Sequence, residues 1–180
     1  MKTYSTVLAL SITSLLMGCS SIGGDQVSVG SATDVNENIT YQIDPITKSR
    51  DLQTASYWAK CDEKLDGVGY RYRTSVYQDG REQTELYVRL KSSRGTYGIH
   101  KAFNQQGQSY KVKTYQPEIK SDSVVYEHIG IIFSPEQLHQ ASQTPINLHL
   151  IGNNNNCTII VEQPVSFAFE ENLKALLAQK

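Results

Sequence analysis

Residues 69–92 read GYRYRTSVYQDGREQTELYVRLKS, and the order of apolar and polar residues in this segment indicates the fold class. In its second half, apolar Leu86, Val88 and Leu90 alternate with polar or charged residues, which is the period-two pattern of a strand with one buried face. Asp79-Gly80 lies between two such runs, and this dipeptide favours a tight turn between antiparallel strands. The stretch therefore predicts a β-hairpin.

The same alternation, rich in Tyr, Val, Ile and Thr, continues over most of the chain after Ile39. Turn signals separate the runs, and the asparagine-rich segment 152–156 predicts a second hairpin. The expected strands are 39–43, 56–61, 69–78, 85–92, 95–102, 109–116, 124–133, 146–151 and 157–163. We therefore expect a mainly β fold, an antiparallel β-sandwich or barrel-like domain with a short internal helix and a C-terminal helix.

Two segments carry helix signals. Ser134-Pro135-Glu136-Gln137 predicts a helix start, because serine can cap, proline suits the first position and glutamine can bond back to the cap. This helix should end near Ser142. After Pro164, apolar residues recur at three-to-four spacing and predict a terminal helix that packs on the sheet, although a helix that binds a partner is an alternative.

An apolar leader begins the chain and ends at Leu16-Met17-Gly18-Cys19. Its apolar run over 7–17 has the length of a secretory leader and is too short for a membrane span, which needs about 20 residues. The last four residues resemble the lipobox of bacterial lipoproteins. The resemblance implies a signal peptide over 1–18, cleavage before Cys19, and lipidation of Cys19 with diacylglycerol and a further acyl chain such as palmitate. The alternative is an ordinary secretory signal followed by a chance cysteine.

Several acyl chains on one cysteine would anchor the chain stably to a membrane. Ser20, in place of the aspartate that retains such proteins at the inner membrane, implies the bacterial outer membrane and leaves open the periplasmic or the surface-facing side. Small polar residues then predict a lipidated N-terminus and flexible tether over 19–38, followed by a single β-rich globular domain over 39–180.

Cys61 and Cys157 remain once Cys19 is acylated. An even pair in an oxidising envelope predicts a structural disulfide. Trp58, the only tryptophan, stands close to Cys61 in the sequence, and we expect it to pack around this disulfide rather than to bind a sugar.

The segment 70–120 carries ten Lys and Arg residues against four acids, a net charge of +6 in a chain whose total is −1. If its strands are neighbours, cations and tyrosines should share one sheet face, where arginine can bind phosphate or carboxylate and tyrosine offers a flat ring. The candidate binding residues are Arg71, Arg73, Tyr77, Tyr87, Arg89, Lys91, Lys111, Lys113 and Tyr115. The alternative is a solvated face that binds nothing.

Motifs of catalysis are few. The four histidines are far apart in the sequence, and we expect no catalytic residues, no metal site and no cofactor. His149 should be a strand-surface residue, and adjacent Glu127 and His128 should point to opposite faces of their strand.

The sequence favours a non-catalytic outer-membrane lipoprotein that acts as a binding or accessory subunit for an envelope component. A stand-alone binder of anionic glycan or lipid is the alternative, and a hydrolase with a site assembled from scattered residues is a remote one. The compartment argues against nucleic acid as a partner.

Overall fold

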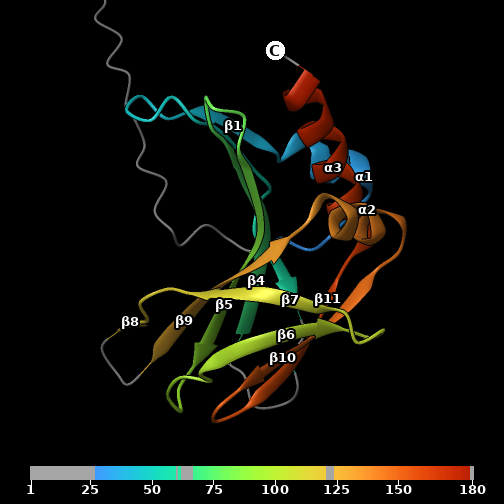
Figure 1. Ribbon diagram of the computed structural model, residues 1–180. Helices are drawn as coiled ribbons and strands as arrows, with labels where there is room; N and C mark the ends of the chain where they lie inside the picture. Colours follow the sequence, from blue (N-terminus) through green and yellow to red (C-terminus); the bar gives the residue numbers. More distant parts are fainter. Residues whose placement is uncertain (1–26, 60, 62–66, 121–123, 179–180) are drawn as a thin grey trace, which may run out of the picture.

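The computed structural model describes residues 27–59, 61, 67–120 and 124–178. The expected signal peptide, the lipobox and Cys19 lie outside these residues. The predicted mainly β fold is confirmed: an antiparallel sheet curls into a half-barrel, with helices against one end (Figure 1).

The sheet runs in the order β1-β2-β4-β5-β9-β7-β6-β10-β11, with β3 paired to β4 and β8 paired to β9. Every pair of these strands is antiparallel, as the short turns between the alternating runs predict. The strands are β1 (Thr40–Ile43), β2 (Arg50–Gln53), β3 (Tyr57–Ala59), β4 (Gly67–Val76), β5 (Glu82–Ser92), β6 (Ile99–Asn104), β7 (Ser109–Thr114), β8 (Glu118–Ile119), β9 (Val125–Phe133), β10 (Ile146–Gly152) and β11 (Asn156–Val161). The sequence did not predict β2 and β8, which are short.

Both predicted hairpins are confirmed. β4 pairs with β5 along its whole length, with Tyr70 opposite Val88. Gly80 has a φ of 81°, a conformation that other residues rarely adopt, and its amide donates to the Tyr77 carbonyl at 3.0 Å. β10 and β11 form the second hairpin around the asparagine-rich turn.

Both predicted helices are also present, as α2 (Pro135–Gln143) and α3 (Gln163–Ala178). Ser134 caps α2 as expected: the Gln137 amide donates to the Ser134 hydroxyl at 3.2 Å, and the Ser134 amide donates to the Gln137 side chain at 2.9 Å. This reciprocal cap fixes where α2 begins after β9.

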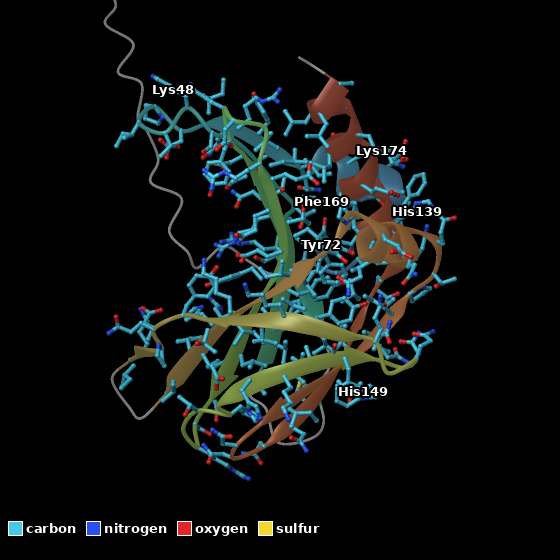
Figure 2. All side chains as sticks on the ribbon, in the orientation of Figure 1. Lys48, Tyr72, His139, His149, Phe169 and Lys174 are labelled. Carbon is cyan, nitrogen blue, oxygen red and sulfur yellow. A yellow bond between two sulfur atoms is a disulfide. The ribbon has the colours of Figure 1, made fainter. Side chains whose placement is uncertain are left out.

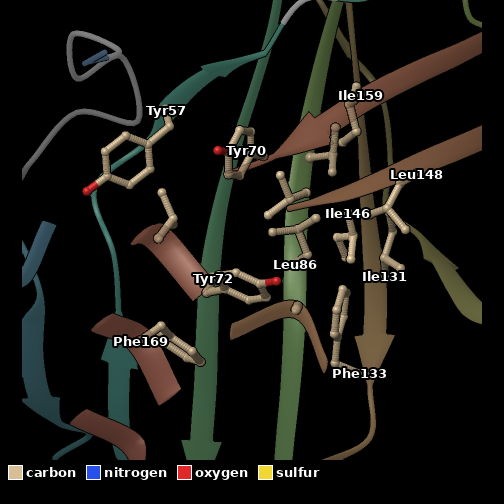
Figure 3. Close-up of a cluster of buried hydrophobic side chains, with 14 of the residues drawn as sticks. Tyr57, Tyr70, Tyr72, Leu86, Ile131, Phe133, Ile146, Leu148, Ile159 and Phe169 are labelled. Carbon is tan, nitrogen blue, oxygen red and sulfur yellow. The ribbon is translucent and has the colours of Figure 1, made fainter. Parts of the chain in front are cut away.

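Helix α3 closes the core by burying aromatic and aliphatic side chains, among them Phe169 against Tyr72 of β4. The Phe169 ring stacks on Tyr72 with their centroids 5.0 Å apart, and Phe133 meets Tyr72 edge-on (Figure 3). The Tyr72 hydroxyl lies 3.1 Å from that of Ser166, so its polar end has a partner inside the core. The terminal helix thus packs on the sheet, as predicted.

The N-terminal boundary differs from the prediction. We expected a tether through Asn38, but α1 (Ala32–Glu37) lies beside α3 and buries Val35 in the core. Val27 also forms a parallel bridge with Tyr57. Ser31 and Asp34 form a reciprocal cap at α1, which accounts for a helix among small polar residues. The folded part therefore begins before residue 39.

The predicted disulfide is confirmed: Cys61 and Cys157 are bonded, with their Cα atoms 5.5 Å apart. The bond ties the segment after β3 to β11 across 96 positions of sequence. On the chain-entropy estimate, such a loop stabilises the fold by about 4–5 kcal/mol. Of the helices in the described ranges, none is long and apolar enough to cross a membrane.

Candidate functional site

The candidate site is the sheet face turned away from the core, where the predicted cations and tyrosines lie. Along β4 and β5, odd-numbered residues point to this face, because the even-numbered ones, such as Tyr72 and Leu86, are buried in the core. Strand β9 lies between β5 and β7 and completes the surface. We call this surface the tyrosine–cation face; it carries Arg71, Arg73, Tyr77, Tyr87, Arg89, Lys91, Lys111, Lys113 and Tyr115.

Register places these residues in rows across the sheet. Arg71 lies opposite Tyr87, and Arg73 lies opposite Glu85. On β9, Gly130 separates Tyr87 from Lys113. The structure thus brings the predicted residues of β4, β5 and β7 onto one surface, with β9 between β5 and β7.

Glu85 is the centre of this surface, and it is only 3% exposed although it points away from the core. Its carboxylate pairs with the Arg73 Nε and accepts from the Tyr115 hydroxyl at 3.0 and 2.9 Å. Arg73 also donates to the Tyr115 hydroxyl at 2.7 Å. Burial lowers the pKa of Arg73, but Glu85 and Tyr115 outweigh it and raise that pKa overall. The three side chains form a closed polar triad.

Gly130 makes room for this triad. A Cβ at Gly130 would lie 2.5 Å from Oε2 of Glu85 and 3.4 Å from a ring carbon of Tyr115. Any other residue would push against the carboxylate. The glycine in β9 therefore accommodates the close approach of side chains from β5 and from the residue after β7.

Aromatic rings hold the cations of the face in place. The Arg73 guanidinium lies 4.4 Å from the centroid of Tyr87, and that of Arg71 lies 5.1 Å from the same ring. Arg89 lies over Tyr126 at 4.8 Å, and the Lys113 ammonium lies over Tyr115 at the same distance. These contacts order the positive charges before any ligand arrives.

His128 joins the face from β9, opposite Arg89. Its Nδ1 lies 2.5 Å from the Tyr87 hydroxyl, and the two rings are stacked. Burial lowers the pKa of His128, and Arg89 lowers it further. Burial raises the pKa of Tyr87 despite the arginines around it. Both rings are thus held in their neutral forms near pH 7.

Arg71 is the most poorly satisfied cation of the surface. Its Nε is buried with no hydrogen-bond partner, while its guanidinium lies over Tyr87. Burial lowers the pKa of Arg71, and Arg73 lowers it further. An anion placed at this point would relieve both the unpaired donor and the repulsion between the two arginines.

A half-open groove of about 310 Å³ adjoins the triad, between the β1–β2 hairpin and β4, β5 and β7. Arg73, Lys113, Tyr77 and Tyr115 line it together with amide and hydroxyl side chains of β1 and β2. Such a lining can donate many hydrogen bonds to an oxygen-rich ligand. Glu85 and Asp51 are the carboxylates in the lining.

Trp58 is a correction to the sequence analysis. Register places it opposite Gly69, on the tyrosine–cation face, whereas the neighbouring Tyr57 points into the core at 2% exposure. Residues 57, 59 and 61 all contact the core, as every second residue of a strand does. Cys61 and its disulfide therefore lie on the opposite side of the strand from the indole. Trp58 is 55% exposed and does not pack around the disulfide.

Sequence reasoning also missed Gly130, Tyr126 and His128 as members of the face. It did not predict that Glu85 would be the buried centre of the face. Glu127 and His128 do point to opposite sides, as predicted, since Glu127 accepts from the backbone amides of residues 97, 98 and 99 at 2.6–3.0 Å. Only a predicted pairing of β5 with β9 would have found these contributions.

The remaining histidines lie elsewhere. His149 is half-buried on β10, where it bonds Thr158 at 3.0 Å and lies against Phe103, in agreement with the expected surface role (Figure 2). His139 on α2 bonds Glu170. Among the described residues, no three His, Cys, Asp or Glu side chains are grouped so as to hold a metal.

Comparisons with protein-family models, with curated proteins and with solved structures found no significant match.

Proposed function

We propose that this chain is a non-catalytic lipoprotein of the bacterial outer membrane that binds an anionic envelope component, glycan or lipid, on the tyrosine–cation face. The observation that carries the proposal is the excess of ordered positive charge. The face presents six Lys and Arg side chains, while Glu85, the acid at its centre, is already engaged by Arg73 and Tyr115.

Preorganisation supports a binding role over a merely solvated surface. Side chains that bind by chance are mobile and lose conformational entropy when they are fixed. Arg71, Arg73, Arg89 and Lys113 are instead held over aromatic rings. Lys111 and Lys113 keep their ammonium groups accessible on an exposed strand. An anionic ligand would meet charges that are already in position.

The non-catalytic part of the proposal is supported by the state of Glu85. A general acid or base must reach a reacting atom with its carboxylate. Both oxygens of Glu85 accept from Tyr115, and the group is only 3% exposed. The carboxylate therefore serves to position Arg73 and Tyr115. No cofactor enters this proposal.

The envelope location is supported by the lipobox-like residues Leu16-Met17-Gly18-Cys19 and by the Cys61–Cys157 disulfide, which suits an oxidising compartment. In cells, the Cys19→Ser variant should lose its membrane anchor. Membrane fractionation checks this: wild type should sediment with outer membrane and the variant should not. Equal sedimentation of the two would contradict lipid anchoring.

The binding proposal is tested with full-length protein purified in detergent and passed over immobilised lipopolysaccharide and immobilised polygalacturonate, a carboxylate polymer. The double variant Lys111→Glu, Lys113→Glu should lose most of its retention on whichever polymer binds. The matched control is Lys48→Glu, Lys101→Glu, which changes the net charge equally; Lys48 lies at the tip of the β1–β2 hairpin (Figure 2). The proposal would be refuted if both double variants lost retention equally, or if neither polymer retained the wild type or the control.

An accessory role for another protein is the second candidate, favoured by β1. It pairs with β2 alone among the described strands, its four residues are all exposed, and Tyr41 and Ile43 are among them. Such an edge can accept a further strand from a partner. Crosslinking in cells from position 43 should then trap one dominant protein; a ladder of weak products or none would argue against this role.

A further inference from the structure

Trp58 is the largest exposed aromatic side chain on the tyrosine–cation face, and it is the only tryptophan in the chain. Tyrosines of the same face, such as Tyr87, are covered by arginine side chains. Trp58 is 55% exposed, and within the described ranges no other aromatic ring or cation contacts its ring. Burying this ring against a ligand would remove a large apolar area from water.

The indole of Trp58 packs on the backbone of β4. Trp58 lies opposite Gly69, and Gly67 is the next residue of β4 on the same face. A Cβ on Gly67 would lie 3.0 Å from Cζ3 and 3.5 Å from Cη2 of Trp58, so the six-membered ring lies against the glycine. One side of the ring system is supported by the strand, and the ring remains more than half exposed.

Cations flank this platform. Across the β4–β5 pair, Gly69 lies opposite Arg89 and Gly67 lies opposite Lys91. Because neither glycine carries a side chain, no side chain of β4 stands between the indole and these two cations. The surface thus offers a flat apolar ring beside two positive charges.

We propose that Trp58 is a stacking platform for a sugar ring, and that the ligand of the tyrosine–cation face is an acidic polysaccharide. This inference rests on the proposed function. A pyranose ring has an apolar C–H face that packs on an aromatic ring, whereas its carboxylates can reach Arg89 and Lys91. A phosphate polymer or an anionic lipid headgroup would bind the cations, but it has no such apolar face to stack on the indole ring.

The experiment uses full-length protein in detergent, with polygalacturonate and inorganic polyphosphate as the two probes. Because Trp58 is the sole tryptophan, intrinsic fluorescence reports on this one ring. Polygalacturonate should shift its emission in a saturable way, and polyphosphate should not. Trp58→Ala should weaken polygalacturonate binding about 3- to 10-fold and leave polyphosphate binding unchanged. Trp58→Phe should recover most of the loss.

Phe167→Ala is the control, since Phe167 is 40% exposed and lies on α3, outside this face; it should bind as wild type does. If Lys111→Glu, Lys113→Glu weakens polygalacturonate binding but Trp58→Ala does not, the platform is refuted while the proposed function stands. The same holds if Trp58→Ala weakens both probes equally. If wild type binds neither probe nor lipopolysaccharide, the proposed function fails as well.

Discussion

The core face of the β4–β5 hairpin is buried and the opposite face is mostly half-buried, and the two faces are stabilised in different ways. On the core face, Tyr72 lies between the Phe169 and Phe133 rings. On the other face, one residue along β4, Arg73 pairs with Glu85 and lies over Tyr87. The core face excludes water by apolar packing, whereas the tyrosine–cation face pairs charges with rings and hydroxyls and is partly open to water.

This difference identifies where function can reside. The apolar core offers no surface to a ligand, because each core side chain is already surrounded by its neighbours. The opposite face still has groups that can contact a ligand: its excess cations, the unpaired Nε of Arg71 and the exposed indole of Trp58. A face of this kind can exchange some contacts for those of a ligand without unfolding the sheet.

The largest effect is expected on the core face. Phe169→Ala should lower the free energy of unfolding by about 3–5 kcal/mol, because it leaves a cavity beside Tyr72 and Phe133. Phe167→Ala on the same helix is the control, since Phe167 is 40% exposed. Chemical denaturation should show a change several times smaller for the control; similar losses would mean that α3 does not close the core as described.

On the tyrosine–cation face, Glu85→Ala should lower the free energy of unfolding by about 2–3 kcal/mol, because Arg73 and Tyr115 lose their shared partner. The loss is smaller than that for a fully buried pair, since Arg73 is 32% exposed and water can solvate it. Glu82→Ala, on an exposed position of the same strand, should be nearly neutral in the same denaturation assay. A neutral result for Glu85→Ala would show that the triad contributes nothing to stability.

A smaller effect is expected at Gly130. Gly130→Ala should destabilise by about 1–2 kcal/mol, because the new methyl group displaces the Glu85 carboxylate. In the Glu85→Ala background, the same substitution should change the free energy of unfolding very little. A double-mutant cycle measures this coupling, and strict additivity would contradict the proposed close approach.

The smallest effect concerns pH. The pKa of His128 is lowered in the folded protein, mainly by burial, so the unfolded chain takes up a proton more readily than the folded one. Stability should therefore fall as pH drops below about 6.5. His128→Gln should flatten this slope in thermal melts between pH 5 and 8. A wild-type slope retained in His128→Gln would refute the assignment.

Much of the fold could be predicted because alternation and turn chemistry are local. The β4–β5 hairpin, the Ser134 cap and the apolar stripe of α3 all follow from residues near one another in the sequence. α1 was missed because a helix of this length is stabilised by contact with α3 rather than by its own propensity. β2 and β8 are too short to show a pattern of their own.

The site was only half accessible from sequence. Alternation along single strands placed Arg71, Arg73, Tyr87 and Lys113 on one side correctly. The contributions of Gly130 and His128 depend on β9 pairing between β5 and β7, a contact between distant segments that no local pattern records. Trp58 was misplaced because its closeness to Cys61 in sequence outweighed the alternation of β3, which sends the two to opposite faces.

Amide NMR shifts during a titration of the isotope-labelled full chain with polygalacturonate test the central claim most directly, since they locate the ligand on the sheet. We predict saturable shifts at Trp58, Arg89, Lys91, Lys111 and Lys113, with little change at β10, which carries none of the residues of this face. Shifts confined to β6, β10 and β11, or no shifts at all, would contradict the account.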